Sequence, residues 1–436
     1  MPSPETILQT YRPGRLAIAV LAALGLGACS SAYQPPSAAS GSGTPHWVSS
    51  WGTSQMPYGQ AEAMPAAFWK DGTVRQIVRL SLGGSQVRVR ISNAYGSDML
   101  IVNEANIAHA VRPGTSELVA GSLQPLRFNG STSVRIPAGA EYVSDPIDLA
   151  ATRGLDVAIS MHLANAAGQQ TGHAGSRTTT FLAPGRQTGA ASLLDAKTVT
   201  RWHQLADVEV SAAPAARAVV VIGDSITDGF GATTDANNRW TDHLVQRIAQ
   251  DGRRPLAVIN AGIGGGRLLR EGLGPSLVTR FERDVLARNG VSHAVVFIGV
   301  NDIGVLRRSK EDTPQAIAAM LEDLKQAHLQ MIARAHAKGI CVIGATITPF
   351  MGSGYYAPAQ HNEALRQAVN DWMRSEKAFD GVLDFDGVLR DPARPSYLAK
   401  AYDSGDGLHP SHAGYAALAA AVPLQQFDSC AYSRPR

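Results

Sequence analysis

The sequence has few of the patterns that mark metal-binding, nucleic-acid-binding and membrane-spanning proteins. It holds three cysteines in 436 residues, and neither paired cysteines nor clustered histidines occur at metal-ligand spacing, so we expect no metal site. Lysine and arginine form no run and the net charge is +3, which gives a nucleic-acid partner little support. The apolar content of 44% and charged content of 17% are those of ordinary globular domains.

The N-terminal apolar run, residues 16–27, is too short to span a membrane. A spanning helix needs about 20 apolar residues, whereas a signal-peptide core needs fewer. Arg12 and Arg15 precede the run, which is the charge pattern of a signal peptide. We therefore expect an exported protein.

The apolar run ends in LGAC at residues 26–29, which resembles a bacterial lipobox. The resemblance implies that residues 1–28 are a lipoprotein signal peptide and that Cys29 carries a diacylglycerol anchor. With Ser30 next, it also implies anchoring to the cell envelope at the outer membrane, on its periplasmic or surface face. The alternative is a plain secretory signal followed by a chance cysteine.

Residues 29–45 are rich in Ser, Ala, Gly and Pro and are predicted to be a flexible tether. Two segments with different hydrophobic periodicity follow it. Residues 46–210 show period-two alternation and no long helical period, which predicts an all-β sandwich domain. Alternating runs at 78–82 and 87–91 flank a Gly-Gly pair and predict a hairpin. Residues 155–163 predict another strand with one buried face.

Beyond residue 217 the rhythm changes to strand, helix, strand, which predicts a three-layer α/β domain with a mostly parallel sheet over 217–430. Short apolar runs predict buried strands at 219–222, 255–259, 294–298 and 341–346. Thr313, Pro314 and Gly339 bound a predicted helix by cap, first-turn and C-terminal preference. Its predicted apolar positions are Ile317, Met320, Leu321, Leu324, Leu329 and Ile332. Further helices are predicted at 361–375 and after Pro410.

Two polar segments suggest a nucleophile and its base. Residues 221–229 (VIGDSITDG) place Ser225 just after a buried strand, where a tight turn would expose its hydroxyl. A hydroxyl is a weak nucleophile and needs a base. Residues 403–410 (DSGDGLHP) place Asp406 and His409 three apart, so a carboxylate could orient an imidazole. Taken singly, the first segment is more often a strand-ending turn with a helix cap, and the second a helix-capping aspartate beside a surface histidine.

Two more segments suggest donors to a developing oxyanion. Residues 298–302 (IGVND) carry Asn301, whose side-chain amide can donate. Residues 260–266 (NAGIGGG) can offer a backbone N–H, and no Gly-Lys-Ser/Thr follows, which argues against a nucleotide-binding loop. All these segments follow strands, and parallel sheets bind ligands at the carboxyl ends of their strands.

Together, over residues 218–422, these segments resemble the four sequence blocks of the SGNH (GDSL-type) hydrolases. The resemblance implies a flavodoxin-like α/β/α domain and a catalytic triad of Ser225, Asp406 and His409. Asp224 would be structural, and Ile226 departs mildly from the leucine of the namesake motif.

The same resemblance implies an oxyanion hole formed by Ser225, Gly265 and Asn301, with Gly265 the best fit among the glycines at 264–266. His409 would take the Ser225 proton, an acyl-enzyme would form on Ser225, and water would hydrolyse it. This chemistry needs no metal and no cofactor.

The substrate class is less determined by the sequence. A β domain ahead of an SGNH domain resembles carbohydrate esterases such as acetylxylan esterases, which implies deacetylation of polysaccharide or other carbohydrate. Tyr355 and Tyr356 could line the acyl pocket or cover the sheet edge. Four tryptophans could stack on sugars or belong to the core; they are Trp47, Trp51, Trp69 and Trp202.

Two other functions stay open. A lipase or lysophospholipase would suit a lipid anchor, and a non-catalytic carbohydrate-binding lipoprotein would need only the β domain.

Two cysteines, Cys341 and Cys430, remain after Cys29. Export permits a disulfide between them, but Cys341 lies in an apolar run where a buried free thiol is equally expected.

Overall fold

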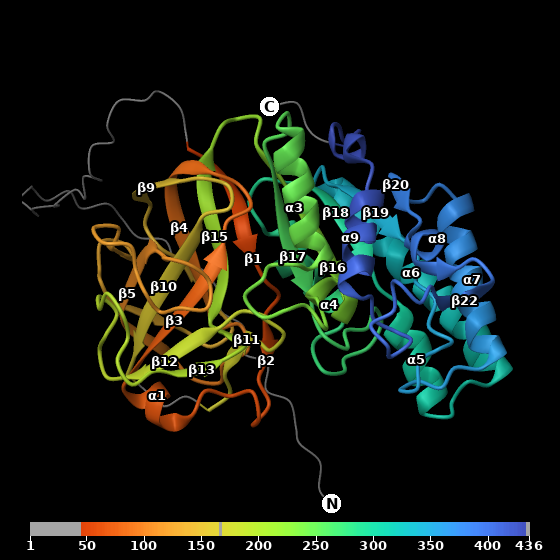
Figure 1. The fold of residues 1–436 in the computed structure, drawn as a ribbon, viewed down its shortest axis with the longest axis horizontal. Coiled ribbons are helices and arrows are strands. Elements are labelled where there is room, and N and C mark those ends of the chain that lie inside the picture. The colour runs from red at the N-terminus through yellow and green to blue at the C-terminus, as the bar shows by residue number, and fades with distance from the viewer. Residues whose placement is uncertain (1–44, 165–167, 433–436) are drawn as a thin grey trace, which may run out of the picture. The chain divides into compact units, whose positions relative to one another are not determined.

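The computed structural model describes residues 45–164 and 168–432 (Figure 1). The predicted signal peptide, Cys29 and almost all of the predicted tether lie outside the described residues. Among the described residues, no helix combines the length and the apolar character needed to cross a membrane.

Antiparallel sheets form the N-terminal part of the described chain. The first contains β1 (His46–Gly52), β15 (Leu205–Ala212), β4 (Gly84–Ser92), β8 (Glu141–Val143) and β9 (Ile147–Ala151). The second contains β13 (Lys197–Val199), β12 (Thr180–Pro184), β3 (Gly72–Arg79), β10 (Asp156–Leu163), β5 (Leu100–His109), β6 (Gln124–Pro125) and β7 (Val134–Ile136). A small third sheet contains β14 (Trp202–His203), β11 (Thr171–His173) and β2 (Met56–Pro57), and α1 (Ala66–Lys70) is a short helix.

The two large sheets share one apolar core, which is the arrangement of a β-sandwich. Val87 and Val89 of β4 belong to the same buried cluster as Val157 and Ile159 of β10. The predicted strand at 155–163 is therefore confirmed as β10, whose alternating apolar residues face this core. The single buried face is wrong, because Ala158, Ser160 and His162 on the opposite face are buried as well.

The predicted hairpin at 78–91 is wrong. β3 pairs with β10 and β12, whereas β4 pairs with β15, β8 and β9, so the two runs lie in different sheets. Alternation reports a buried face but not the partner strand, and both runs face the shared core. The glycines serve close approach: a Cβ at Gly83 or Gly84 would lie within 2.6 Å of a carbonyl oxygen of another strand.

A five-stranded parallel sheet follows, with strand order β17-β16-β18-β19-β20. Its strands are β16 (Arg217–Gly223), β17 (Leu256–Gly262), β18 (Val291–Phe297), β19 (Cys341–Ala345) and β20 (Gly381–Leu383). Chain order reverses between β16 and β18, which places a topological switch point at the carboxyl end of β16.

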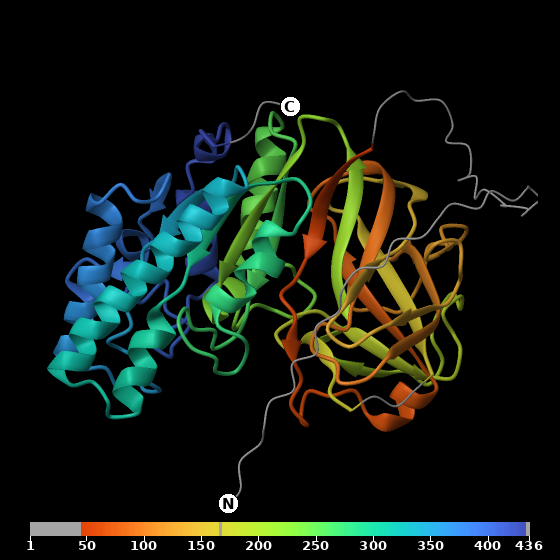
Figure 2. The same ribbon diagram turned by 180° about the vertical axis from the view of Figure 1, so that it is seen from behind.

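Helices cover both faces of this sheet, as Figures 1 and 2 show from opposite sides. Val219 and Val221 pack on one face, against α3 (Trp240–Asp251), α8 (Phe385–Leu389), α9 (His412–Ala421) and η2 (Leu424–Phe427). Val220 and Ile222 pack on the other, against α4 (Leu277–Phe281), η1 (Glu282–Leu286), α5 (Val300–Arg308), α6 (Pro314–Ala337) and α7 (Gln360–Ser375). The predicted three layers are therefore present. A small hairpin of β21 (Arg390–Asp391) and β22 (Arg394–Leu398) precedes α9.

Helix α6 confirms its predicted bounds. The Thr313 side chain accepts a hydrogen bond from the N–H of Ala316 at 3.2 Å, Pro314 begins the helix, and Gly339 adopts a φ of 75° just beyond its end. Leu329 is the exception among the predicted apolar positions, because it is 37% exposed.

The sandwich and the α/β layers are joined by buried contacts. Ala216, Ala218 and Ala257 belong to the apolar cluster of the sandwich. The backbone N–H of Val258 in β17 donates to the Ser81 hydroxyl at 3.0 Å. The β-sandwich thus covers the edge of the parallel sheet at β17.

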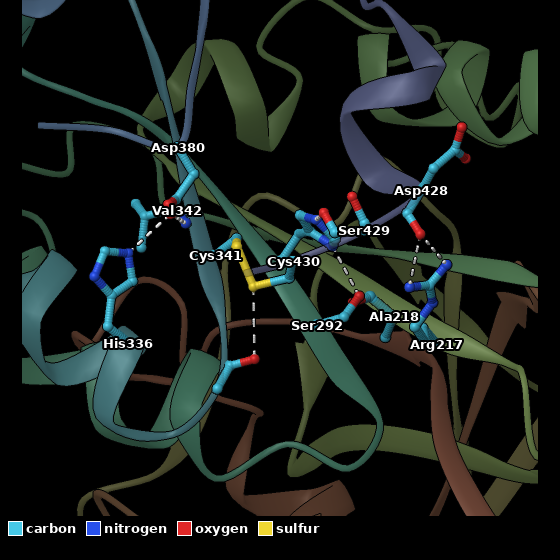
Figure 3. Close-up of a disulfide and its surroundings, with 12 residues drawn as sticks. Arg217, Ala218, Ser292, His336, Cys341, Val342, Asp380, Asp428, Ser429 and Cys430 are labelled. Carbon is cyan, nitrogen blue, oxygen red and sulfur yellow. Dashed lines mark hydrogen bonds and ion pairs between the residues drawn. A yellow bond between two sulfur atoms is a disulfide. The ribbon is translucent and has the colours of Figure 1, made fainter. Parts of the chain in front are cut away.

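Cys341 and Cys430 form a disulfide, so the disulfide alternative is the one that the structure supports (Figure 3). Their Cα atoms are 5.6 Å apart across a sequence separation of 89. The bond ties the segment after η2 to the start of β19. Nearby, the ring of His293 lies 3.2 Å from the carbonyl oxygen of Ser429 and adds a second tie.

Candidate active site

Ser225 lies at the carboxyl end of β16, on the first residue of the one-turn helix α2 (Ser225–Asp228). The Asp224 carboxylate caps this turn by accepting from the N–H of Ile226 at 3.0 Å. Gly229, with a φ of 95°, ends it. Burial raises the pKa of Asp224 to about 7. The short turn leaves the Ser225 side chain at the sheet edge, where it is 7% exposed.

Three side chains from two distant segments meet here. The Nε2 atom of His409 lies 2.8 Å from Ser225 Oγ, and its Nδ1 atom lies 2.6 Å from Asp406 Oδ2. The other carboxylate oxygen of Asp406 accepts from the backbone N–H groups of Leu408 and His409, at 2.9 and 2.8 Å. Burial tends to raise the pKa of Asp406, but these hydrogen bonds hold it below its usual value. The carboxylate is thus ionised and fixed against the imidazole.

The environment of His409 favours its neutral form. Burial lowers the pKa of the imidazole, the hydrogen bond and charge of Asp406 act in the opposite direction, and the charge of Arg177 lowers it again. The Phe230 ring stacks on the imidazole with 4.0 Å between centroids. A neutral imidazole bonded to a hydroxyl can act as a general base.

Among the described residues, the glycine loop after β17 leaves one backbone N–H without a hydrogen-bond partner. The N–H of Gly264 donates to Asp228 Oδ2 and that of Gly266 to the Ile263 carbonyl, both at 2.9 Å. Within the described part of the chain, the Gly265 N–H has no hydrogen-bond partner. Gly265 has a φ of 68°, which favours glycine. Of the three glycines, Gly265 is therefore the one whose backbone N–H can donate to a ligand.

Asn301 lies in the first turn of α5, and its amide is held on both sides. Its Nδ2 donates to the Gly266 carbonyl at 2.8 Å, and its Oδ1 accepts from the Tyr356 hydroxyl at 2.7 Å. An amide nitrogen carries two hydrogens, so one remains for a ligand. Burial raises the pKa of Tyr356, which keeps it a donor.

Several positioning residues were not found from the sequence. His173 of β11 lies 2.9 Å from Asp228 Oδ1, and Asp228 holds the N–H of Gly264. Asp302 accepts from the N–H groups of Leu268 and Leu269, at 2.9 and 3.1 Å. No local motif marks His173 in the sequence. Asp302 directly follows Asn301, so the sequence block that contains Asn301 could have indicated it.

Arg280 is a fully buried cation that braces the strand ends. It donates to the carbonyls of Gly223 and Ala261, at 2.8 and 2.6 Å, and to the Ser54 hydroxyl of the β part at 2.7 Å. Asp284 lies 3.1 Å away and balances its charge. The turn before Ser225 is therefore anchored partly by the sandwich.

The predicted aromatic residues have different locations. Trp69 and Trp202 are buried, Trp47 lies beneath the Arg88 guanidinium at 4.3 Å, and Trp51 packs edge-on against Trp202 at 4.9 Å. These contacts give the tryptophans structural roles. Tyr355 is 59% exposed beside the buried Tyr356.

Ser225, His409 and Asp406 thus have the relative geometry of a serine hydrolase triad. Residues 221–417 match the model of the GDSL-like lipase/acylhydrolase family. The α/β part of this chain is therefore a GDSL-like hydrolase domain.

Similar solved structures cover about half of this chain. A lipolytic protein of the G-D-S-L family from Desulfitobacterium hafniense is 26% identical over 47% of this chain and 96% of its own, with a TM-score of 0.35. A lipase/acylhydrolase from Enterococcus faecalis is 25% identical over 47% and 92%, with a TM-score of 0.36. A catalytic mutant of an acetylxylan esterase from Geobacillus stearothermophilus is 19% identical over 50% and 97%, with a TM-score of 0.36. No curated protein matches the sequence.

Proposed function

We propose that this protein is a serine esterase in which Ser225 is the nucleophile, His409 the general base and Asp406 its orienting acid. The observation that carries the proposal is the continuous chain of contacts from Asp406 Oδ2 through the imidazole to Ser225 Oγ, at 2.6 and 2.8 Å. This assembled geometry favours an enzyme over a non-catalytic carbohydrate-binding lipoprotein.

The reaction proceeds in two steps. Ser225 Oγ attacks the ester carbonyl carbon while His409 Nε2 takes the hydroxyl proton and then gives it to the leaving alcohol. The oxyanion is held by the N–H groups of Ser225 and Gly265 and by the Asn301 amide. Water, deprotonated by His409, then hydrolyses the acyl-enzyme and releases the acid.

The test replaces the nucleophile. Ser225→Ala should lower kcat for 4-nitrophenyl acetate by several orders of magnitude, because triad deletions remove the covalent path. A fluorophosphonate probe should label the parent protein and not the variant. Ser309→Ala, at the exposed end of α5, is the matched control and should react like the parent. Normal turnover or labelling in Ser225→Ala refutes the assignment.

Acetylated carbohydrate is the substrate class we favour. The order of a β domain followed by a GDSL-like domain supports it, as do two exposed aromatic rings at the site. Phe230, 43% exposed, stacks on His409, and Tyr355, 59% exposed, packs against Tyr356, which holds Asn301. Exposed aromatic faces suit pyranose rings. Acetate release from a panel of acetylated polysaccharides tests this directly.

A lipase or lysophospholipase is the second candidate, because one apolar side chain beside the oxyanion donors is exposed. Leu273 is 72% exposed, and a Cβ at Gly265 would lie 2.6 Å from its Cδ1 atom. A series of 4-nitrophenyl esters separates the two candidates. A sharp preference for acetate supports deacetylation, whereas rates that rise with chain length, together with fatty-acid release from lysophospholipid, support the lipase.

Export and lipid anchoring through Cys29 complete the proposal, with the protein held at the outer membrane. The lipobox resemblance supports this, and the Cys341–Cys430 disulfide suits an oxidising compartment. Cys29→Ala should shift the protein from the membrane to the soluble fraction and abolish labelling by a palmitate analogue. A variant that stays with the membrane would contradict the anchor.

A further inference from the structure

A loop of the β part, residues 174–179 between β11 and β12, is fixed against the hydrolase domain. At its start, the ring of His173 contacts Asp228 Oδ1 at 2.9 Å. At its end, Thr179 donates through its N–H and its hydroxyl to the Asp235 carboxylate, at 2.7 and 2.6 Å. The Asp235 N–H in turn donates to the carbonyl of Arg177 at 3.0 Å. Attachment at both ends makes this loop a rigid support.

Arg177 lies at the tip of this loop and has no anionic partner among the described residues. Its φ of 49° is in the left-handed region, where a non-glycine residue is uncommon. Its Nε atom is buried, and the Nε–H group has no hydrogen-bond acceptor within residues 45–164 and 168–432. No ion pair or hydrogen bond of its guanidinium is found there. A buried N–H donor without an acceptor costs free energy, so a ligand oxygen that accepts from this guanidinium would be favoured.

The guanidinium lies over the Phe230 ring, close enough to His409 for its charge to act on the imidazole. Its central carbon is 5.5 Å from the centroid of the Phe230 ring, which stacks on His409 at 4.0 Å. His409 must pass its proton to the leaving alcohol, so the alcohol part of the ester lies beside this imidazole. The oxyanion donors Gly265 and Asn301 belong to other loops. Arg177 is therefore placed to contact the alcohol part.

We infer that Arg177 forms an anion subsite for a carboxylate on the alcohol part of the ester, so that the preferred substrates are acetylated saccharides containing uronic acid. The inference rests on the proposed esterase function and names its substrate class. Arg177 is a binding residue that takes no part in bond breaking. A guanidinium binds a carboxylate in a bidentate manner with two charge-assisted hydrogen bonds.

The charge balance of the site supports an anionic substrate. During acylation His409 becomes a cation, and the positive charge of Arg177 opposes that change. A bound carboxylate compensates the Arg177 charge and removes this opposition. Binding of the acidic group thus favours the same step that the bare arginine disfavours. A neutral substrate gives no such compensation.

The test compares two esters that differ only in one carboxylate: an acetylated methyl glucuronoside and the matching acetylated methyl glucoside. Acetate release gives kcat/KM for each, and their ratio within one protein cancels differences in active enzyme. Hydrogen bonds to a charged group correspond to roughly a 10- to 100-fold preference for the acidic ester. The preference should fall as salt is raised, since Arg177 is only half-buried and its charge is open to screening.

The same ratio of kcat/KM values is then measured for variants of Arg177 and for a control variant at another arginine. Arg177→Gln should bring the ratio close to one, and Arg177→Lys should keep part of the preference because it keeps the charge. Arg135→Gln, on the exposed side of β7, should leave the ratio at the parent value.

Several results would overturn the inference while the esterase stands. These are a parent ratio near one, a ratio that Arg177→Gln leaves unchanged, and turnover of 4-nitrophenyl acetate without acetate release from either saccharide. An Arg177-dependent preference for lysophospholipid in place of the uronoside would also overturn it and assign the cation to a lipid phosphate. Full turnover by Ser225→Ala would instead refute the proposed esterase, whatever the ratio.

Discussion

At the scale of single residues, the candidate site depends on polar groups that are each held by a neighbour. The Asn301 amide is fixed by the Gly266 carbonyl on one side and by the Tyr356 hydroxyl on the other. The Asp406 carboxylate is fixed by two backbone N–H groups as well as by the imidazole. Groups fixed in this way need no rearrangement when charge develops in the transition state.

Tyr356 tests whether this orientation matters. Tyr356→Phe removes the hydrogen bond to Asn301 Oδ1 and leaves that buried oxygen without its partner. We expect kcat to fall roughly 3- to 10-fold, in line with one neutral hydrogen bond, with little change in KM, because the oxyanion exists only in the transition state. Tyr142→Phe, at an exposed position of β8, is the control. Equal kinetics for the two variants would show that the hydroxyl has no positioning role.

The pH profile reports the protonation of His409. The base must be neutral, and its pKa lies below its ordinary value because burial and the charge of Arg177 outweigh Asp406. kcat/KM for 4-nitrophenyl acetate should therefore persist into mild acid and fall only as pH drops through this lowered pKa. Arg177→Gln removes one cause of the lowering, so its acid limb should move to higher pH. An unmoved limb, or one moved to lower pH, would contradict the electrostatic assignment.

At the scale of elements, very short segments hold the chemistry and long ones support them. The proposed nucleophile lies on a one-turn helix, α2, and the proposed base lies in the loop before α9. The long helix α6 and the buried strands β16 and β18 supply the core from which these ends project. The segment after η2 is held differently, because it is tied to β19 by the Cys341–Cys430 bond.

The disulfide should contribute measurably to stability. It closes a loop with a sequence separation of 89, and loss of a native disulfide costs about 2–5 kcal/mol. Cys430→Ser should lower the free energy of unfolding by that amount in denaturant titrations, and reductant should lower the parent protein to the same level. The double variant Cys341→Ala/Cys430→Ser should match the single variant and not respond to reductant. Parent stability that reductant leaves unchanged would contradict the prediction.

At the scale of the whole molecule, the sandwich supports the loops that carry the candidate site. Ser54 receives a hydrogen bond from Arg280, which also holds the Gly223 carbonyl just before the catalytic turn. His173 holds Asp228, and through it the loop of Gly264. The apolar cluster of the sandwich also includes Ala218 and Ala257 of the parallel sheet. These contacts couple the two parts energetically.

Coupling of this kind predicts one unfolding transition. Calorimetry of the processed chain should show a single peak with equal calorimetric and van't Hoff enthalpies. Ser54→Ala should move that whole peak to lower temperature, at a cost of about 1–3 kcal/mol, because it leaves the buried Arg280 short of an acceptor. Ser85→Ala, at an exposed position of β4, should not move it. Two separate peaks would show that the parts unfold independently.

The sequence by itself determined the local features of this protein. The caps of α6, the buried strands of the parallel sheet and the positions of Ser225, Asp406, His409 and Asn301 follow from short-range patterns, because caps, periods and motif spacing are written in neighbouring residues. It did not determine strand partners, as the split of β3 and β4 between two sheets shows, because alternation specifies a buried face and not a neighbour.

Only the tertiary structure decided which distant groups meet. The pairing of Cys341 with Cys430 and the contact of His173 with Asp228 depend on packing between segments far apart in the chain. The approach of Arg177 to the Phe230 ring beside His409 has the same origin. No local pattern encodes such contacts, because a lone histidine or arginine in a β domain has the same sequence signature whether it faces solvent or a catalytic site. The physical reason is that burial and charge proximity are properties of the packed chain.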